Sequence, residues 1–170
     1  MKLQAALLTA LLTSAALAPQ AMSAQVPAAS QTVCMTSPTP TGWVVTGYSD
    51  WYACGTPSNP YYNSKAIMDA TGTPSGGSVT ACMAPGPAGF YATAYSYSFS
   101  CEITKTPSGT FNNQEQLTNL NGRPSGTTVT ICGIQSAPSG WVQVAIAQSY
   151  LCVYARSGGV GNNAVTIRKS

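Results

Sequence analysis

The chain has 170 residues, of which seven are Lys or Arg, four are Asp or Glu, six are Cys and none is His, so the formal net charge is +3. The absence of histidine excludes Ser-His and Cys-His nucleophiles, an imidazole general base and a His-ligated metal. So small a charge disfavours a nucleic-acid partner, which requires a dense basic face, whereas 44% apolar and 9% aromatic residues are sufficient for a folded core.

The first 24 residues have the pattern of a secretory signal peptide. A positive start at Lys2 precedes an apolar run over 3–18, and the small residues of 21–24 form a cleavage site. The run is shorter than the roughly 20 apolar residues of a membrane span, and Pro19 ends it. We therefore expect a mature chain of residues 25–170 that is secreted or periplasmic and has no membrane span. In an oxidising compartment its six cysteines are expected to form three disulfides.

The mature chain consists of one unit repeated three times. In each unit a Pro precedes a Cys by seven or eight residues, a Gly-aromatic pair follows, and a second Cys comes eleven residues after the aromatic. An Asn then precedes an aliphatic residue by four positions. The units are 27–73, 74–123 and 124–170, and they fill the single domain 25–170 almost completely.

Each unit is expected to contain four short strands joined by turns. In the third unit these are the β-branched run 128–132, the run 141–146, the segment 149–154 with the second Cys, and the run 164–168. About twelve strands in three units suggest an all-β fold resembling a β-trefoil, a six-stranded barrel closed by three hairpins. The Gln-x-Trp signature of the ricin-type lectins is absent from all three units, so no sugar-binding residue is transferred from that family. The alternatives are three small disulfide-stapled β-modules in a row and a β-sandwich.

Two cysteine pairings respect the repeat. Pairing within a unit joins residues 20, 19 and 20 positions apart, whereas pairing between units would form Cys54–Cys82 and bring the chain ends together. We predict pairing within units, because it joins neighbouring strands, and each closed loop should stabilise the fold by about 3 kcal/mol. No metal site is predicted, since no Cys-x-x-Cys motif is present. The predicted bridges are Cys34–Cys54, Cys82–Cys101 and Cys132–Cys152.

Threefold repetition separates positions that the common fold requires from positions that belong to one unit. Positions that are apolar in every unit are predicted to be core. The other interpretation of the shared aromatics is three equivalent platforms for stacking sugars. The Asn repeated in each unit is predicted to stabilise a turn. The shared apolar sets are Trp43/Phe90/Trp141, Tyr52/Phe99/Tyr150 and Ile67/Leu117/Ile167, and the repeated amides are Asn63, Asn113 and Asn163.

Aromatic residues present in one unit alone are the candidate binding residues. Trp51 corresponds to Ser98 and Ser149 in the other units, and a Pro-rich loop contains a Tyr-Tyr pair whose counterparts hold no tyrosine. An aromatic side chain that the common core does not require is expected to be exposed, and exposed aromatics gather at recognition surfaces. The predicted ligand-binding residues are Trp51, Tyr61, Tyr62 and Tyr97.

The sequence favours a binding module over an enzyme. Its carboxylates fall at non-equivalent positions, and no catalytic motif brings two of them together, so neither a catalytic residue nor a cofactor is predicted. The expected partner of this monomer is a neutral glycan or a protein, including a protease held by an exposed loop, and not a nucleic acid. The alternative is a structural or surface-coat protein without a specific ligand. The four carboxylates are Asp50, Asp69, Glu102 and Glu115.

Overall fold

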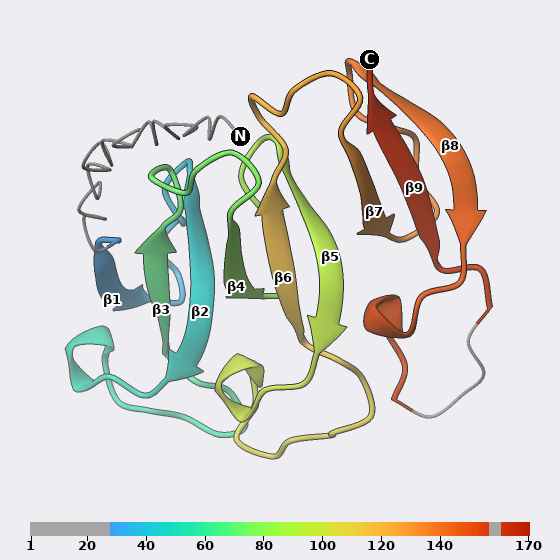
Figure 1. Ribbon diagram of the computed structural model, residues 1–170. Coiled ribbons are helices and arrows are strands. Elements are labelled where there is room, and N and C mark those ends of the chain that lie inside the picture. Colours follow the sequence, from blue (N-terminus) through green and yellow to red (C-terminus); the bar gives the residue numbers. More distant parts are fainter. Residues whose placement is uncertain (1–27, 157–160) are drawn as a thin grey trace, which may run out of the picture.

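The computed structural model describes residues 28–156 and 161–170, which form three units of the same topology (Figure 1). The predicted signal peptide, residues 1–24, lies outside the described residues. The first unit contains β1 (Ser30–Cys34), β2 (Trp43–Ser49), the 3-10 helix η1 (Tyr52–Cys54) and β3 (Ser64–Asp69). The second contains β4 (Ser78–Cys82), β5 (Phe90–Ser96), η2 (Phe99–Cys101) and β6 (Gln114–Asn119). The third contains β7 (Thr128–Cys132), β8 (Trp141–Ala147), η3 (Tyr150–Cys152) and β9 (Ala164–Lys169).

The last strand of each unit lies in the middle of a three-stranded antiparallel sheet. The strand orders are β1-β3-β2, β4-β6-β5 and β7-β9-β8, so the predicted all-β class is confirmed. The third of the four strands predicted in each unit is wrong: the segment 149–154 contains η3 instead. There the backbone N–H of Cys152 donates to the carbonyl oxygen of Ser149 at 3.1 Å, a bond across three residues that tightens the chain into a 3-10 turn.

The Gly-aromatic pair of each repeat is explained by the turn that precedes the second strand. In the second unit the N–H of Phe90 donates to the carbonyl oxygen of Pro87 at 3.0 Å, and Gly89 has a φ of +83°. A positive φ at the third residue of such a turn strongly favours glycine. Gly42 and Gly140 have the same geometry, with φ of +84° and +75°.

The three sheets follow one another in a row (Figure 1). Between the first two units β2 contacts β4 and η2, and between the last two β5 contacts β7 and η3. Strand pairing within the described sheets stays inside each unit, whereas a trefoil would pair strands of different units around one barrel. A trefoil is therefore not confirmed. The arrangement agrees with the predicted alternative of three small β-modules in a row.

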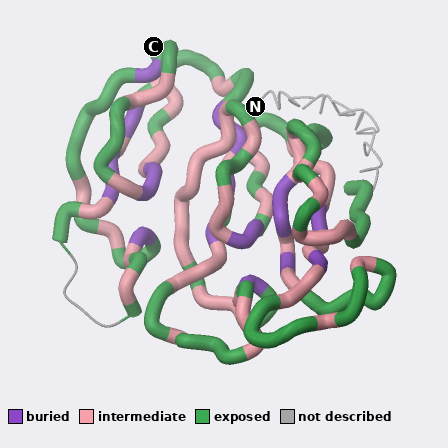
Figure 2. Tube along the Cα trace, turned by 180° about the vertical axis from the view of Figure 1, so that it is seen from behind, coloured by how far each residue is buried: buried purple, intermediate pink, exposed green. Residues whose placement is uncertain are grey.

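The core lies along the central strands and continues through the junctions between units. Ile67, Leu117 and Ile167 are 0%, 4% and 0% exposed, which confirms this shared set as core. At the first junction Val44 of β2 packs in one cluster with Leu117. At the second junction Leu120 packs with Ile131 and Ile167. Figure 2 shows the buried stretches on the strands and the 3-10 helices, with exposed loops around them.

Candidate functional site

A disulfide in each unit fixes the 3-10 helix against the sheet. Each bond joins the last residue of the first strand to the last residue of the 3-10 helix, with Cα–Cα distances of 5.3, 5.1 and 5.1 Å. The predicted pairing within units is confirmed. Each bridge closes a separation of 19 or 20 residues and holds the chain on both sides of the second strand. The three bridges are Cys34–Cys54, Cys82–Cys101 and Cys132–Cys152.

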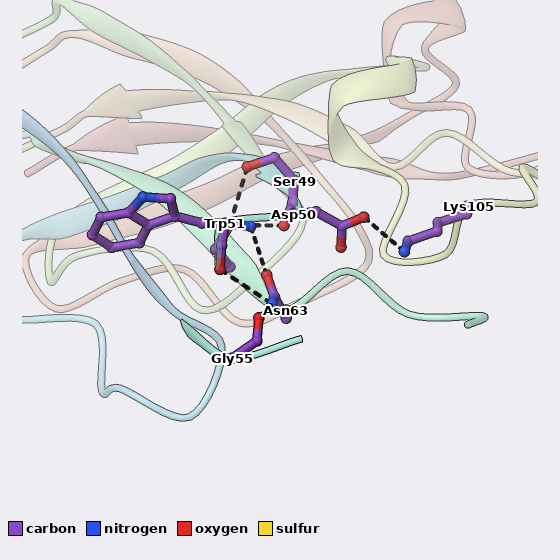
Figure 3. A network of polar contacts seen from close by, with 7 residues as sticks. Ser49, Asp50, Trp51, Gly55, Asn63 and Lys105 are labelled. Atoms are coloured by element: carbon purple, nitrogen blue, oxygen red, sulfur yellow. Dashed lines mark hydrogen bonds and ion pairs between the residues drawn. The ribbon is translucent and has the colours of Figure 1, made fainter. Parts of the chain in front are cut away.

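The repeated Asn fixes the residue that precedes each 3-10 helix. In the first unit the side-chain oxygen of Asn63 accepts a hydrogen bond from the N–H of Trp51 at 2.8 Å, and its amide donates to the carbonyl oxygens of Trp51 and Gly55 (Figure 3). Asn113 makes the same pair of bonds to the backbone of Ser98, and Asn163 to that of Ser149. The predicted turn-stabilising role of these three residues is confirmed.

The first residue of each 3-10 helix is an exposed aromatic. The exposed fractions are 83% for Tyr52, 73% for Phe99 and 81% for Tyr150. The prediction that this shared set belongs to the core is wrong. The segment is a 3-10 helix and not a strand, and in the second and third units its Cys is buried while the aromatic faces solvent. We call Tyr52, Phe99 and Tyr150 the aromatic row.

Trp51 extends the aromatic row in the first unit. This residue is 44% exposed and directly precedes Tyr52, while serine stands at its place in the other units. Its backbone is held by Asn63, and Figure 3 shows the indole ring on the side opposite Lys105. The expected exposure of Trp51 is thus observed, at a position that the disulfide and Asn63 hold in place.

Cations of one unit contact the end of the second strand in the unit before it. Lys105, four residues after Cys101, forms an ion pair with Asp50 at 2.7 Å and lies 5.9 Å from the ring centroid of Tyr62. The equivalent Arg156 lies 4.7 Å from the ring centroid of Tyr97, which occupies the place of Asp50. The two junctions therefore use the same backbone positions with different chemistry, an ion pair in one and a cation–π contact in the other.

The long loops also join neighbouring units through short bridges. Tyr61 pairs with Thr104, and Phe111 pairs with Ala155, as isolated antiparallel bridges. Phe111 precedes its repeated Asn by two residues, as Tyr61 does, so the position of Tyr61 is aromatic in two units. The ring of Phe111 stacks on that of Tyr154 at a centroid distance of 5.1 Å.

The structure does not gather the predicted ligand-binding residues into one site. Trp51 adjoins the aromatic row, while Tyr61 and Tyr62 lie at the first junction. Tyr97 lies at the second junction, where its ring meets that of Phe99 edge to face at 5.2 Å. Sequence reasoning preferred the core interpretation of the aromatic row over the alternative of three platforms for stacking sugars. The available signal was the recurrence of an aromatic two residues before the second Cys of every unit.

A groove between the first two units has a volume of about 820 Å³. Its described lining includes Met68, Asp69, Pro74 and Val79 and no aromatic side chain. Asp69 accepts hydrogen bonds from the backbone N–H and the hydroxyl of Thr71, at 2.8 and 2.7 Å, and these bonds lower the pKa of its carboxyl group. The groove therefore presents one carboxylate that is already hydrogen-bonded, among apolar and small polar side chains.

Within residues 28–156 and 161–170, no three cysteine or carboxylate side chains gather where they could hold a metal ion. Over the same part of the chain, no helix has the length and hydrophobicity that crossing a membrane requires. Comparison with known protein families, with curated proteins and with solved structures finds no match to this chain.

Proposed function

We propose that the mature chain is a secreted, non-catalytic binding module whose aromatic row binds a neutral glycan. One observation carries this proposal: the same large aromatic position is more than 70% exposed in all three units. A single exposed aromatic needs no explanation, but exposed apolar side chains that recur at one repeated position are typical of recognition surfaces.

The chemistry around the row fits a neutral polyhydroxylated ligand. Aromatic faces bind the apolar faces of sugar rings, and the residues next to the row offer hydroxyl and amide groups in place of charges. Ser98 and Ser149 precede two of the row residues directly. The nearest cations are engaged, since Lys105 pairs with Asp50 and Arg156 contacts the ring of Tyr97. A ligand that bears no charge loses little solvation energy at such a surface.

Further observations support a scaffold without catalysis. Three disulfides are compatible with an extracellular or other oxidising compartment and hold all three row residues on short, rigid turns. A rigid surface loses little conformational entropy when it binds a ligand. The carboxylate of Asp50 is paired with Lys105, and that of Asp69 is bonded to Thr71, so neither stands ready as a free acid or base.

A glycan array tests this proposal with secreted protein that spans residues 25–170. We expect selective binding to neutral oligosaccharides, and loss of at least tenfold in affinity for a Tyr52→Ala/Phe99→Ala/Tyr150→Ala variant. Its thermal midpoint should stay within a few degrees of the wild-type value, because substitutions at exposed sites usually change stability by no more than about 0.5 kcal/mol. Trp51→Ala is expected to weaken binding further when added to the triple variant.

The matched control is Ile134→Ala, because Ile134 is an apolar residue 58% exposed that lies outside the row. This variant should bind like the wild type. Absence of any selective glycan signal, or equal loss in the Ile134→Ala variant, would overturn the proposal. Selective capture of a protein ligand without any glycan signal would replace the glycan by a protein partner.

A further inference from the structure

The second strand of the last unit lacks the cover that the same strand has in the other units. In β2, none of the residues 44–48 is exposed, because β4 and η2 of the next unit lie against this strand. In β5, none of the residues 91–95 is exposed, because β7 and η3 lie against it. In β8, every residue of 142–146 is exposed. In the described part of the chain, the stacking face of the third unit is therefore open.

β8 is an edge strand that exposes apolar side chains on both sides of its sheet. Val142, Val144 and Ile146 are 45%, 46% and 52% exposed, and no residue of 142–146 is charged. A bulge between Gln143 and Ala145 places Val142 and Ile146 on opposite sides of the sheet. Val44 is the counterpart of Val142 and is 3% exposed, which shows how completely this position is covered inside the row. Terminal units of stacked-repeat proteins carry a polar outer face when only water meets them. An apolar edge strand without a partner is instead an association site.

The other end of the row has the polar face that β8 lacks. Ser30, Gln31 and Thr32 of β1 are exposed. Gln31 stands where the second and third units have Val79 and Val129, which pack against core clusters. A head-to-tail contact of β1 with β8 would put this polar Gln at a position where valine packs at the junctions inside the row, which is less favourable than an apolar contact. A head-to-tail contact would also propagate without closing.

We propose that β8 is a dimerisation surface that is covered by β8 of a second copy of this chain, in antiparallel orientation about a two-fold axis near Val144. Inside the row, the second strand of a unit is covered by the first strand and the 3-10 helix of the next unit. In the dimer, β8 of the second copy lies where that cover would be and supplies an apolar strand. A two-fold contact matches an apolar face with the same face and closes after two copies.

The charges beside β8 are compatible with this orientation. Arg168 is exposed and lies opposite Val142 in the register of β8 and β9. In an antiparallel pair centred on Val144, the two copies of Val142 lie on opposite sides of the axis, about four strand positions apart, so the two arginines lie near opposite ends of the contact. Four residues of extended strand span about 13 Å, which exceeds the screening length of about 8 Å at physiological ionic strength. Repulsion between the two cations is then small.

Sedimentation velocity of the disulfide-intact protein over 1–100 µM tests the proposal. We expect a concentration-dependent dimer with no larger species, and a monomer for Val144→Arg with an unchanged thermal melt, because Val144 is exposed within one chain. Thr32→Arg on β1 is the matched control and should still dimerise. A wild-type protein that stays monomeric at 100 µM overturns the proposal. Filaments that Thr32→Arg abolishes also overturn it, because they indicate head-to-tail contact.

A second variant tests the geometry directly. Val144→Cys should form an intermolecular disulfide under mild oxidation, since facing residues of antiparallel strands have Cα atoms about 4.5–5.5 Å apart. The matching Thr32→Cys should not. Cross-linking of Thr32→Cys at an equal rate would show that contact is non-specific and would overturn the proposal. Because neither variant lies in the aromatic row, glycan binding and dimerisation succeed or fail separately.

Discussion

Glu115 makes the stability of this fold depend on pH in a way that the structure predicts. This side chain is 8% exposed and lies on β6, between Ala81 of β4 and Tyr95 of β5 in the strand register. The equivalent position in the third unit is Val165, which is fully buried. Burial raises the pKa of the Glu115 carboxyl from 4.5 to about 7, although a hydrogen bond from the backbone of Ala84 acts in the opposite direction.

The size of the pH-dependent loss in the free energy of unfolding follows from that rise in pKa. The folded protein holds a proton on Glu115 between about pH 4.5 and pH 7, whereas the unfolded chain has released it. Below this range Glu115 is protonated in both the folded and the unfolded state, so its ionisation does not change the free energy of unfolding. As the pH rises through the range, the free energy of unfolding falls, because the folded state must bury a charge. About 2.5 pH units at about 1.4 kcal/mol each give a loss of at most about 3–4 kcal/mol.

Urea denaturation of the wild type and of Glu115→Gln at pH 4.5, 6 and 8 measures this loss. The variant should gain stability relative to the wild type as the pH rises, with most of the gain between pH 4.5 and 7. The difference between the two proteins cancels the titration of the other carboxylates. Asp69→Asn provides a control of opposite sign: the pKa of Asp69 is lowered, so any deficit of this variant should shrink as the pH falls. A difference between Glu115→Gln and wild type that is constant over pH 4.5–8 would refute the reasoning.

Two further substitutions test the core and the turn. Trp141→Ala should lower the free energy of unfolding by about 3–5 kcal/mol, because Trp141 is 8% exposed and packs with Ile131 and Ile167; a loss below 1 kcal/mol in urea denaturation would contradict this burial. Asn113→Ala removes both hydrogen bonds to the backbone of Ser98 and should cost about 1–2 kcal/mol. The same measurement would contradict that role if the variant were as stable as the wild type.

Repetition in the sequence was sufficient to predict the units, the disulfides and part of the core. The spacing of the cysteines determined their pairing, because only bonds within units avoid bringing the chain ends together, and the structure has these bonds. Ile67, Leu117 and Ile167 were predicted core residues because an aliphatic side chain recurs at one position, and burial of that side chain is the main favourable term for each unit. Asn113 and its counterparts were predicted correctly for the same reason.

Recurrence alone did not distinguish a buried position from an exposed one. Phe99 was assigned to the core because an aromatic side chain recurs at its position in every unit. The segment forms a 3-10 helix, and its three-residue turn places Phe99 and Cys101 on different sides, so that Cys101 is buried and Phe99 is exposed. Local sequence did not reveal this difference, because the helix is fixed by a disulfide and by Asn113, which lies 15 residues away from Ser98.

Contacts between units also could not be predicted from the sequence. The contacts of Arg156 with Tyr97 and of Lys105 with Asp50 join residues of different units, and only the stacking of the sheets brings them together. Stacking likewise determines that Val44 is covered and Val142 is not, although the two residues occupy the same place in the repeat. The sequence determined the structure within each unit, since the strands of a unit pair with one another and one disulfide joins them. The tertiary structure decided which faces remain open, because exposure depends on whether another unit follows.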